Sequence, residues 1–149
     1  MFYLHLLIGT ILIGVTVFIH AICLDFIFKH IEPLNNFVNK AVPFFKRATF
    51  LAFVVLGVMI AHTIEIWIWA LLYYISGAVP DFESALYFST SSFTTVGYGD
   101  VVLDKSWRLL GGIESANGFI LFGWSTAFVF EIMYLLYDKE KPPMRGDKK

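Results

Sequence analysis

The sequence is poor in charged residues and in cysteine. Only 15% of its 149 residues are charged and 58% are hydrophobic, whereas a soluble domain carries about 25% charged residues. The formal net charge is −1, which gives no sign of a nucleic-acid partner. The single cysteine, Cys23, excludes a disulfide within the chain. No internal repeat is visible, and the length is that of one domain.

Three segments are long and apolar enough to cross a bilayer, which takes about 20 helical residues. They cover residues 2–28, 48–75 and 109–137. The first has no Lys or Arg at its start and no small-residue cleavage site, so we interpret it as a retained helix. The sequence therefore predicts an all-α membrane protein with three transmembrane helices.

A short fourth helix is expected between the second and third spans. Turn-forming residues 76–80 end the second span, and Asp81 is placed to cap a helix over residues 82–93. Twelve residues are too few to cross a bilayer, so this helix is predicted to enter the membrane and return. Its C-terminal end, which is the negative end of the helix dipole, favours a cation there.

The run that follows this helix reads Thr94-Thr95-Val96-Gly97-Tyr98-Gly99-Asp100. Successive carbonyls can face one axis only if some residues adopt left-handed dihedrals, which Gly97 and Gly99 do without strain. Stacked rings of such carbonyls replace the water around a dehydrated ion. We expect Thr95 to add a hydroxyl at the inner end of the stack and Tyr98 to brace the loop.

The stretch from Phe82 to Asp100, with the apolar run from Leu109, resembles the pore module of the potassium channel superfamily. The resemblance implies a filter that binds potassium as the permeant ligand, with no other cofactor. Its lining residues would be Thr95, Val96, Gly97, Tyr98 and Gly99. Thr94 would end the pore helix, and Asp100 would lie just outside the filter mouth.

Several polar residues fall inside the apolar segments, where they usually face protein or water. We expect Glu114 to support the filter through Ser91, Ser92 or Arg108; the alternative is a hydrated residue near the interface. His62 and Glu65 share a helix face, as a structural hydrogen bond or a proton sensor. We expect no metal site among the four histidines and Cys23.

The inner helix carries glycines that each cost about 1 kcal/mol relative to alanine. Gly118 is the preferred gating hinge by resemblance and Gly123 is the alternative, although either could serve close packing instead. By the same resemblance, Asn117 is expected to face the cavity below the filter. A rotation of the helix by one residue position is left open.

The distribution of Lys and Arg predicts the orientation. These residues gather in the segment after the first span and in the tail, whereas the pore loop holds only Lys105 and Arg108. The positive-inside rule therefore places linker and tail in the cytoplasm, and the N-terminus and filter mouth outside the plasma membrane.

Four regions follow along the chain. Residues 1–28 form the leading helix, 29–47 a cytoplasmic linker, 48–137 the pore domain and 138–149 a charged, unfolded cytoplasmic tail. Within the linker, residues 37–46 read equally well as an interfacial helix or a connecting loop. The leading helix is expected to pack around the outer helix, in a lipid-facing or peripheral position, and not to line the pore. Its polar atoms lie mainly at His5, Thr10, Thr16, His20 and Asp25.

One filter segment cannot encircle an ion, so we expect a homotetramer with fourfold symmetry, embedded in lipid. The sequence predicts a potassium-selective channel and no catalysed reaction. The alternatives are a non-selective cation channel, a potassium transporter subunit and a non-conducting accessory membrane protein.

Overall fold

The computed structural model describes residues 2–37 and 44–138, which form four helices and contain no β-strand. Three helices are long, namely α1 (Phe2–Phe37), α2 (Phe44–Ile75) and α4 (Arg108–Asp138). The fourth, α3, covers Phe82–Phe93. Each long helix contains a stretch apolar and long enough to cross a membrane: Tyr3–His30, Arg47–Ile75 and Arg108–Leu136. The predicted all-helical membrane fold is confirmed.

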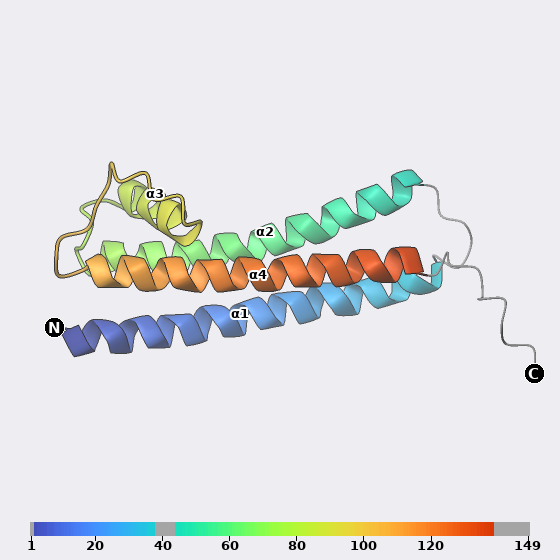
Figure 1. Cartoon of the computed structure of the whole chain (residues 1–149), viewed down its shortest axis with the longest axis horizontal. Coiled ribbons are helices and arrows are strands. Elements are labelled where there is room, and N and C mark those ends of the chain that lie inside the picture. Colours follow the sequence, from blue (N-terminus) through green and yellow to red (C-terminus); the bar gives the residue numbers. More distant parts are fainter. Residues whose placement is uncertain (1, 38–43, 139–149) are drawn as a thin grey trace, which may run out of the picture.

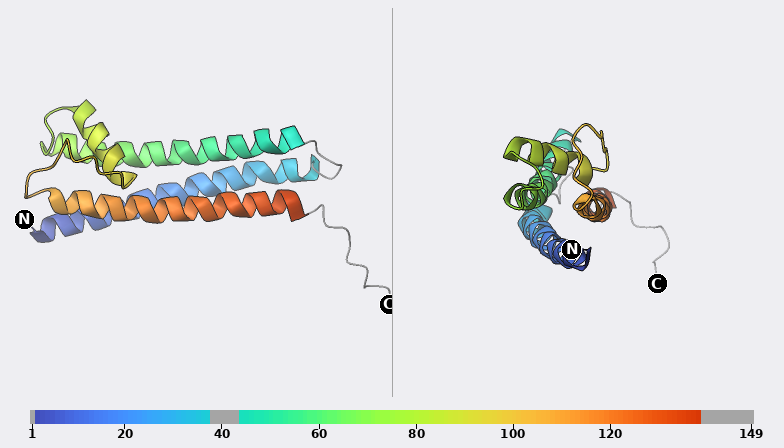
Figure 2. Two further views of the ribbon diagram at one scale, coloured as in Figure 1. Left: turned by 45° about the horizontal axis from the view of Figure 1, so that its top comes forward. Right: turned by 90° about the vertical axis from the view of Figure 1, so that its left-hand side faces the viewer.

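The three long helices run beside one another along the length of the molecule (Figure 1). Helices α1 and α4 point in the same direction and α2 runs opposite to them. The short α3 lies at the end of the bundle that holds the N-terminus, and it contacts both α2 and α4 (Figure 2). Helix α1 also contacts both α2 and α4, so it is part of the bundle.

Two helix ends differ from those expected. α1 continues to Phe37, through the turn-rich sequence around Pro33, and α2 already begins at Phe44. A proline removes only one backbone hydrogen bond, and neighbouring turns can carry a helix past it. The sequence left open whether residues 37–46 form an interfacial helix or a loop. Most of this segment, residues 38–43, lies outside the described residues. Residues 139–149 of the predicted tail also lie outside them.

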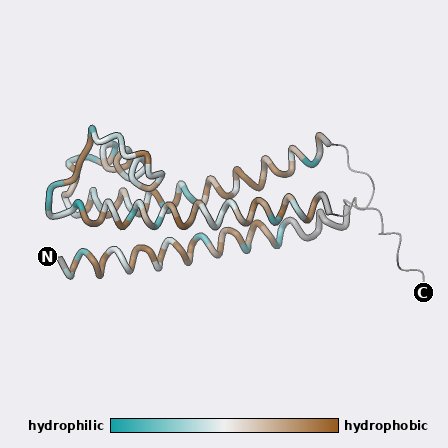
Figure 3. Tube along the Cα trace, viewed as in Figure 1, coloured by the Kyte–Doolittle hydropathy of each residue, from teal (hydrophilic) through white to brown (hydrophobic). Residues whose placement is uncertain are grey.

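The core is divided along the bundle. One apolar cluster lies beneath α3 and includes Trp69, Tyr73, Phe93, Leu110 and Leu121. A smaller cluster near the opposite end contains Val54, Ile132 and Leu136. Hydrophobic residues also cover the outside of the long helices, whereas hydrophilic residues gather in the loops around α3 (Figure 3). An apolar exterior is what a bilayer requires.

Two glycines allow α1 to approach its neighbours closely. A Cβ on Gly9 would lie 3.0 Å from Ile113 of α4. A Cβ on Gly57 of α2 would likewise lie 3.0 Å from Ile27 of α1. Small residues at helix contacts are typical of membrane bundles, where close backbone approach replaces the hydrophobic effect.

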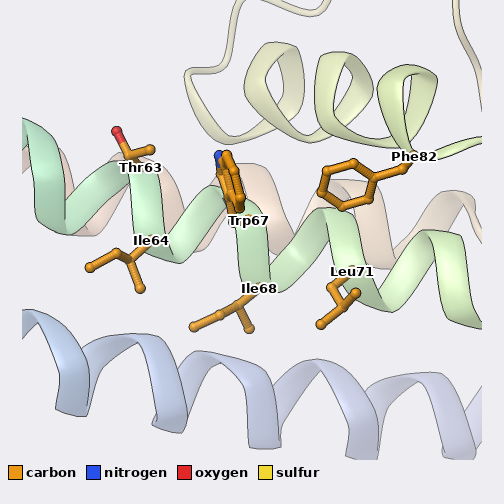
Figure 4. Close-up of a pocket in the computed structure, with 6 residues that line it drawn as sticks. All are labelled: Thr63, Ile64, Trp67, Ile68, Leu71 and Phe82. Carbon is orange, nitrogen blue, oxygen red and sulfur yellow. The ribbon is translucent and has the colours of Figure 1, made fainter.

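A shallow apolar groove lies on α2 at the start of α3. Figure 4 shows its lining, in which the rings of Trp67 and Phe82 approach edge to face with centroids 5.9 Å apart. The remaining lining residues are Thr63, Ile64, Ile68 and Leu71. Its surface is almost wholly hydrocarbon, as suits a surface that meets lipid tails.

Candidate functional site

The pore helix α3 begins and ends where the sequence predicts. The carboxylate of Asp81 accepts a hydrogen bond from the Ser84 backbone N–H at 2.8 Å, which caps the helix. This bond holds the pKa of Asp81 below its usual value. At the other end, Thr94 is the C-cap and its hydroxyl donates to the Thr90 carbonyl at 2.7 Å. The helix therefore delivers the chain directly into the filter sequence.

Every second residue of the filter sequence has a left-handed backbone. The φ angles of Gly97 and Gly99 are +58° and +80°. Thr95 has φ of +60°, and it is the only non-glycine residue with a positive φ in the described parts of the chain. An L-residue adopts this conformation at a cost of about 1–2 kcal/mol. The alternation breaks the strand-like reversal of successive carbonyls, which is the backbone requirement for a carbonyl-lined path.

Ser91 of α3 holds the filter sequence from behind. Its backbone carbonyl accepts a hydrogen bond from the Gly97 N–H at 3.1 Å. Its side-chain hydroxyl accepts one from the Tyr98 N–H at 3.2 Å. The Thr95 N–H donates to the Ser92 carbonyl at 2.9 Å. These bonds fold the filter strand back along the helix that precedes it.

The end of the filter sequence next to Asp100 is held through tyrosines. Tyr98 stacks on Tyr87 of α3, with ring centroids 6.4 Å apart. The Tyr87 hydroxyl donates to the Asp100 carboxylate at 2.7 Å. Tyr98 braces the loop as expected, yet its side chain is 72% exposed in the single chain.

Glu114 of α4 reaches the far side of the pore helix and is fully buried. Its carboxyl oxygens contact the Tyr73 hydroxyl of α2 at 2.8 Å and the Ser89 hydroxyl of α3 at 2.5 Å. Ser89 also donates to the Ile66 carbonyl at 2.9 Å. Three helices thus meet at one carboxyl group. Its partner on the pore helix is Ser89, and not one of the three residues expected from the sequence.

The inner helix α4 touches the end of the pore helix at two points. The Ser115 hydroxyl donates to the Ser92 carbonyl at 2.8 Å. Three residues further along, a Cβ on Gly118 would overlap the backbone carbonyl of Phe93. Gly118 is therefore required for close packing. Gly123 has no neighbouring atom within 4 Å of the equivalent position, and α4 is one continuous helix through both glycines.

The expected position of Asn117 is wrong. Asn117 is 2% exposed, and its amide donates to the Thr16 hydroxyl of α1 at 2.8 Å. It therefore faces the leading helix and not a cavity below the filter. Three polar residues of the leading helix are buried within the bundle, namely His5, Thr16 and His20. Thr10 and Asp25 are exposed.

A buried polar group between α1, α2 and α4 was only partly foreseen. The predicted pairing of His62 with Glu65 is present, with His62 Nδ1 3.0 Å from Glu65 Oε2. His20 of α1 and Ser125 of α4 complete the group. In the sequence, His20 is visible as a polar residue inside an apolar span. Its partner Glu65 is 45 residues away, so no local sequence pattern connects the two residues.

Comparison with known proteins agrees with this arrangement. The family model described as "Ion channel" matches residues 50–134, which extend from α2 through α3 and the filter sequence into α4. No curated protein and no solved structure matched the chain. The family match covers more than half of the 149 residues. The chain therefore belongs to the ion channel family.

Proposed function

We propose that this channel is potassium-selective and conducts passively through a carbonyl-lined filter formed by Thr95 to Gly99. The observation that carries the proposal is the alternation of left-handed dihedrals at Thr95, Gly97 and Gly99 within this sequence. It supports a strand whose carbonyls line one side, as dehydration of an ion requires. No reaction is catalysed in this proposal, and potassium is the permeant ligand.

The working unit in this proposal is a homotetramer. All residues from Thr95 to Asp100 are exposed in the single chain, although several of them contact α3. A single strand can contact an ion with its carbonyls from one side only. Four strands around a fourfold axis close each ring of carbonyls. The exposure of the filter is therefore what a subunit of a closed ring should show.

We also infer the orientation in the plasma membrane. Helices α1 and α4 run in the same direction, so the N-terminus and the filter lie at one end of the bundle. The Lys- and Arg-rich segments 29–47 and 138–149 would face the cytoplasm. The N-terminus, Asp100 and the filter mouth would then face outside.

Bending of the inner helix is assigned to Gly123 in this proposal, with Gly118 serving as a packing position. A bend at Gly118 would have to displace the Phe93 carbonyl at the end of the pore helix. Gly123 meets no such obstacle within the subunit. Support of the filter is assigned to Thr94, Ser91, Asp100 and Glu114.

Recording from the purified chain in planar bilayers tests the proposal. Under a tenfold potassium gradient with sodium balancing the other side, the reversal potential should approach about 59 mV, the value for one monovalent ion. Gly99→Ala should abolish selectivity or conduction, because a Cβ at φ +80° is strained in every subunit.

Gly77→Ala is the matched control. Gly77 also has a left-handed φ, +71°, but it lies in the turn between α2 and α3. Its substitution carries similar backbone strain without touching the filter, so selectivity should survive. A wild-type reversal potential near zero in mixed potassium and sodium would instead identify a non-selective channel. Absence of current from an intact tetramer would favour an accessory protein or a transporter subunit.

A further inference from the structure

Four buried side chains from three helices close into a ring beneath the filter region. His20 Nδ1 lies 2.8 Å from Glu65 Oε1, and His62 Nδ1 lies 3.0 Å from Glu65 Oε2. On the opposite side, His62 Nε2 and His20 Nε2 lie 2.9 and 3.1 Å from the Ser125 hydroxyl. None of the four is more than 5% exposed.

The ring contains too few protons when its groups are in their ordinary states. Four hydrogen bonds need four protons, whereas two neutral histidines and one serine supply three and an ionised Glu65 supplies none. One bond is then unmade, in a place where an unmade polar contact is costly. The Glu65 carboxylate is also left with an uncompensated charge. One additional cationic species, either a proton or a metal ion, would compensate this charge.

We propose that His20, His62 and Glu65 bind a divalent transition-metal ion of the zinc type. If both histidines carry their proton on Nε2, both donate to the two lone pairs of the Ser125 oxygen. Both Nδ1 atoms then present lone pairs toward the Glu65 carboxylate. One ligand atom from each of the three residues lies within 4.8 Å of the others.

The ligand chemistry favours zinc over calcium or magnesium. Two imidazole nitrogens and one carboxylate match a common zinc ligand set that leaves a fourth position open, whereas calcium and magnesium prefer oxygen ligands. Tetrahedral ligands around zinc are separated by about 3.3 Å. His20 Nδ1 and His62 Nδ1 lie 2.8 and 3.0 Å from different oxygens of Glu65, and the three ligand atoms lie within 4.8 Å of one another, so small side-chain movements would bring them to the zinc spacing.

Ser125 acts as a positioning residue in this site. Metal-bound histidines almost always donate their second ring N–H to a fixed acceptor, which sets the tautomer and the ring orientation. Here one hydroxyl serves both rings. Aromatic rings pack around them, with the His62 and Phe122 centroids 4.3 Å apart and those of His20 and Trp124 5.3 Å apart. A bound ion would tie α1 to α2, and through Ser125 to α4.

Zinc content of the intact channel is the direct test. The full chain, carrying no polyhistidine tag, is expressed in zinc-supplemented medium, because the buried site fills most readily while the helices assemble. After removal of loosely bound ions, atomic emission should give about one zinc per chain. His20→Ala should lose this zinc, and His30→Ala, a change at the exposed histidine of the same helix, should retain it.

Two further variants keep the test decisive if His20→Ala fails to fold. Glu65→Gln keeps the size of the side chain and removes the charge, so zinc should be lost from a folded channel. Ser125→Ala leaves all three ligands in place, and zinc affinity should fall 10- to 100-fold without disappearing. Added zinc should raise the Tm of the His30→Ala channel but not that of Glu65→Gln.

The proposal is independent of ion selectivity, since it concerns metal content alone. It is overturned if the wild-type chain holds no zinc above the level found in folded Glu65→Gln. The ring would then be a hydrogen-bonded group closed by one extra proton. Equal zinc in wild type and in all three site variants would also overturn it, because the metal would then be bound elsewhere.

Discussion

Tyr87 donates its hydroxyl to Asp100 at 2.7 Å, so the pore helix holds the residue that directly follows the filter. The bond favours the ionised carboxylate, and it keeps the pKa of Asp100 below its usual value. The same bond raises the pKa of the Tyr87 hydroxyl. The two residues lie 13 positions apart and on either side of the whole filter strand.

Tyr87→Phe should raise the pKa of Asp100 toward that of a free carboxyl. A depressed pKa stabilises the folded filter mouth at pH values above the unfolded-state pKa, and this stabilisation is lost as pH falls through the folded-state pKa. The variant lacks the bond at every pH, so the part of the acid-dependent stability that this bond gives through Asp100 should disappear. Titration of the Asp100 carboxyl by NMR checks the shift. Tyr74→Phe, on α2, should leave the Asp100 titration unchanged.

Gly118→Ala should disrupt the channel, because its Cβ would overlap the Phe93 carbonyl at the base of the pore helix. Overpacking of this kind costs about 1–3 kcal/mol in each subunit. The Tm of the channel in detergent should fall, and potassium current should be reduced or lost.

Gly123→Ala is the matched comparison for Gly118→Ala. Its Cβ meets no atom within 4 Å in the subunit, and alanine favours helix by about 1 kcal/mol. Folding should therefore be preserved, and any effect should appear in the open probability. Equal loss of stability in the two variants would refute the assignment of Gly118 to packing and Gly123 to bending.

Glu114→Gln should be tolerated, whereas Glu114→Leu should not. The Ser89 hydroxyl has one proton but contacts two oxygens, Ile66 O and Glu114 Oε1, so a carboxyl that donates to Ser89 satisfies every contact. A glutamine amide can likewise donate to Ser89 and accept from Tyr73. Leucine leaves the Tyr73 hydroxyl without its acceptor, at about 1–3 kcal/mol, while Ser89 keeps its bond to the Ile66 carbonyl. Thermal unfolding of the purified channel, compared with wild type, measures the difference.

Thr16→Val should loosen the leading helix. It removes the hydroxyl that accepts from Asn117, whose amide oxygen already has no hydrogen-bond partner among the described residues. An unpaired buried amide costs about 1–3 kcal/mol. Thr10→Val is the control, since that exposed hydroxyl donates only to the Leu6 carbonyl of its own helix. Faster hydrogen exchange near Thr16 in Thr16→Val alone is the expected result; equal exchange in both variants would contradict it.

Local sequence signals predicted the pore helix and part of the filter. Asp81 marks the start of α3, the filter sequence marks its end, and Gly97 and Gly99 have the expected left-handed dihedrals. Thr95 was not expected to share that conformation, because threonine rarely adopts it. The surrounding bonds to Ser91 and Ser92 impose it, and such bonds depend on the folded arrangement.

The inward face of α1 could not be predicted in the same way. A membrane helix is apolar all round, so no amphipathic stripe marks the side that meets protein. His20 and Thr16 find their partners in Glu65 and Asn117, which are 45 and 101 positions away. Only the folded bundle brings them together. The polar residues inside α1 were thus visible in the sequence, but their direction was not.

The separation of Thr16 from Asn117 has a consequence for biosynthesis. A ribosome adding roughly 5–20 residues per second takes about 5–20 s to make the 101 residues from the one after Thr16 to Asn117. During that interval Thr16 can bond to the Leu12 and Ile13 carbonyls of its own helix. The hydrogen-bond partners of His20 among the described residues are both translated later: first Glu65 and then Ser125. Its imidazole therefore gains one partner when the second helix is made and the other only when the last helix is made.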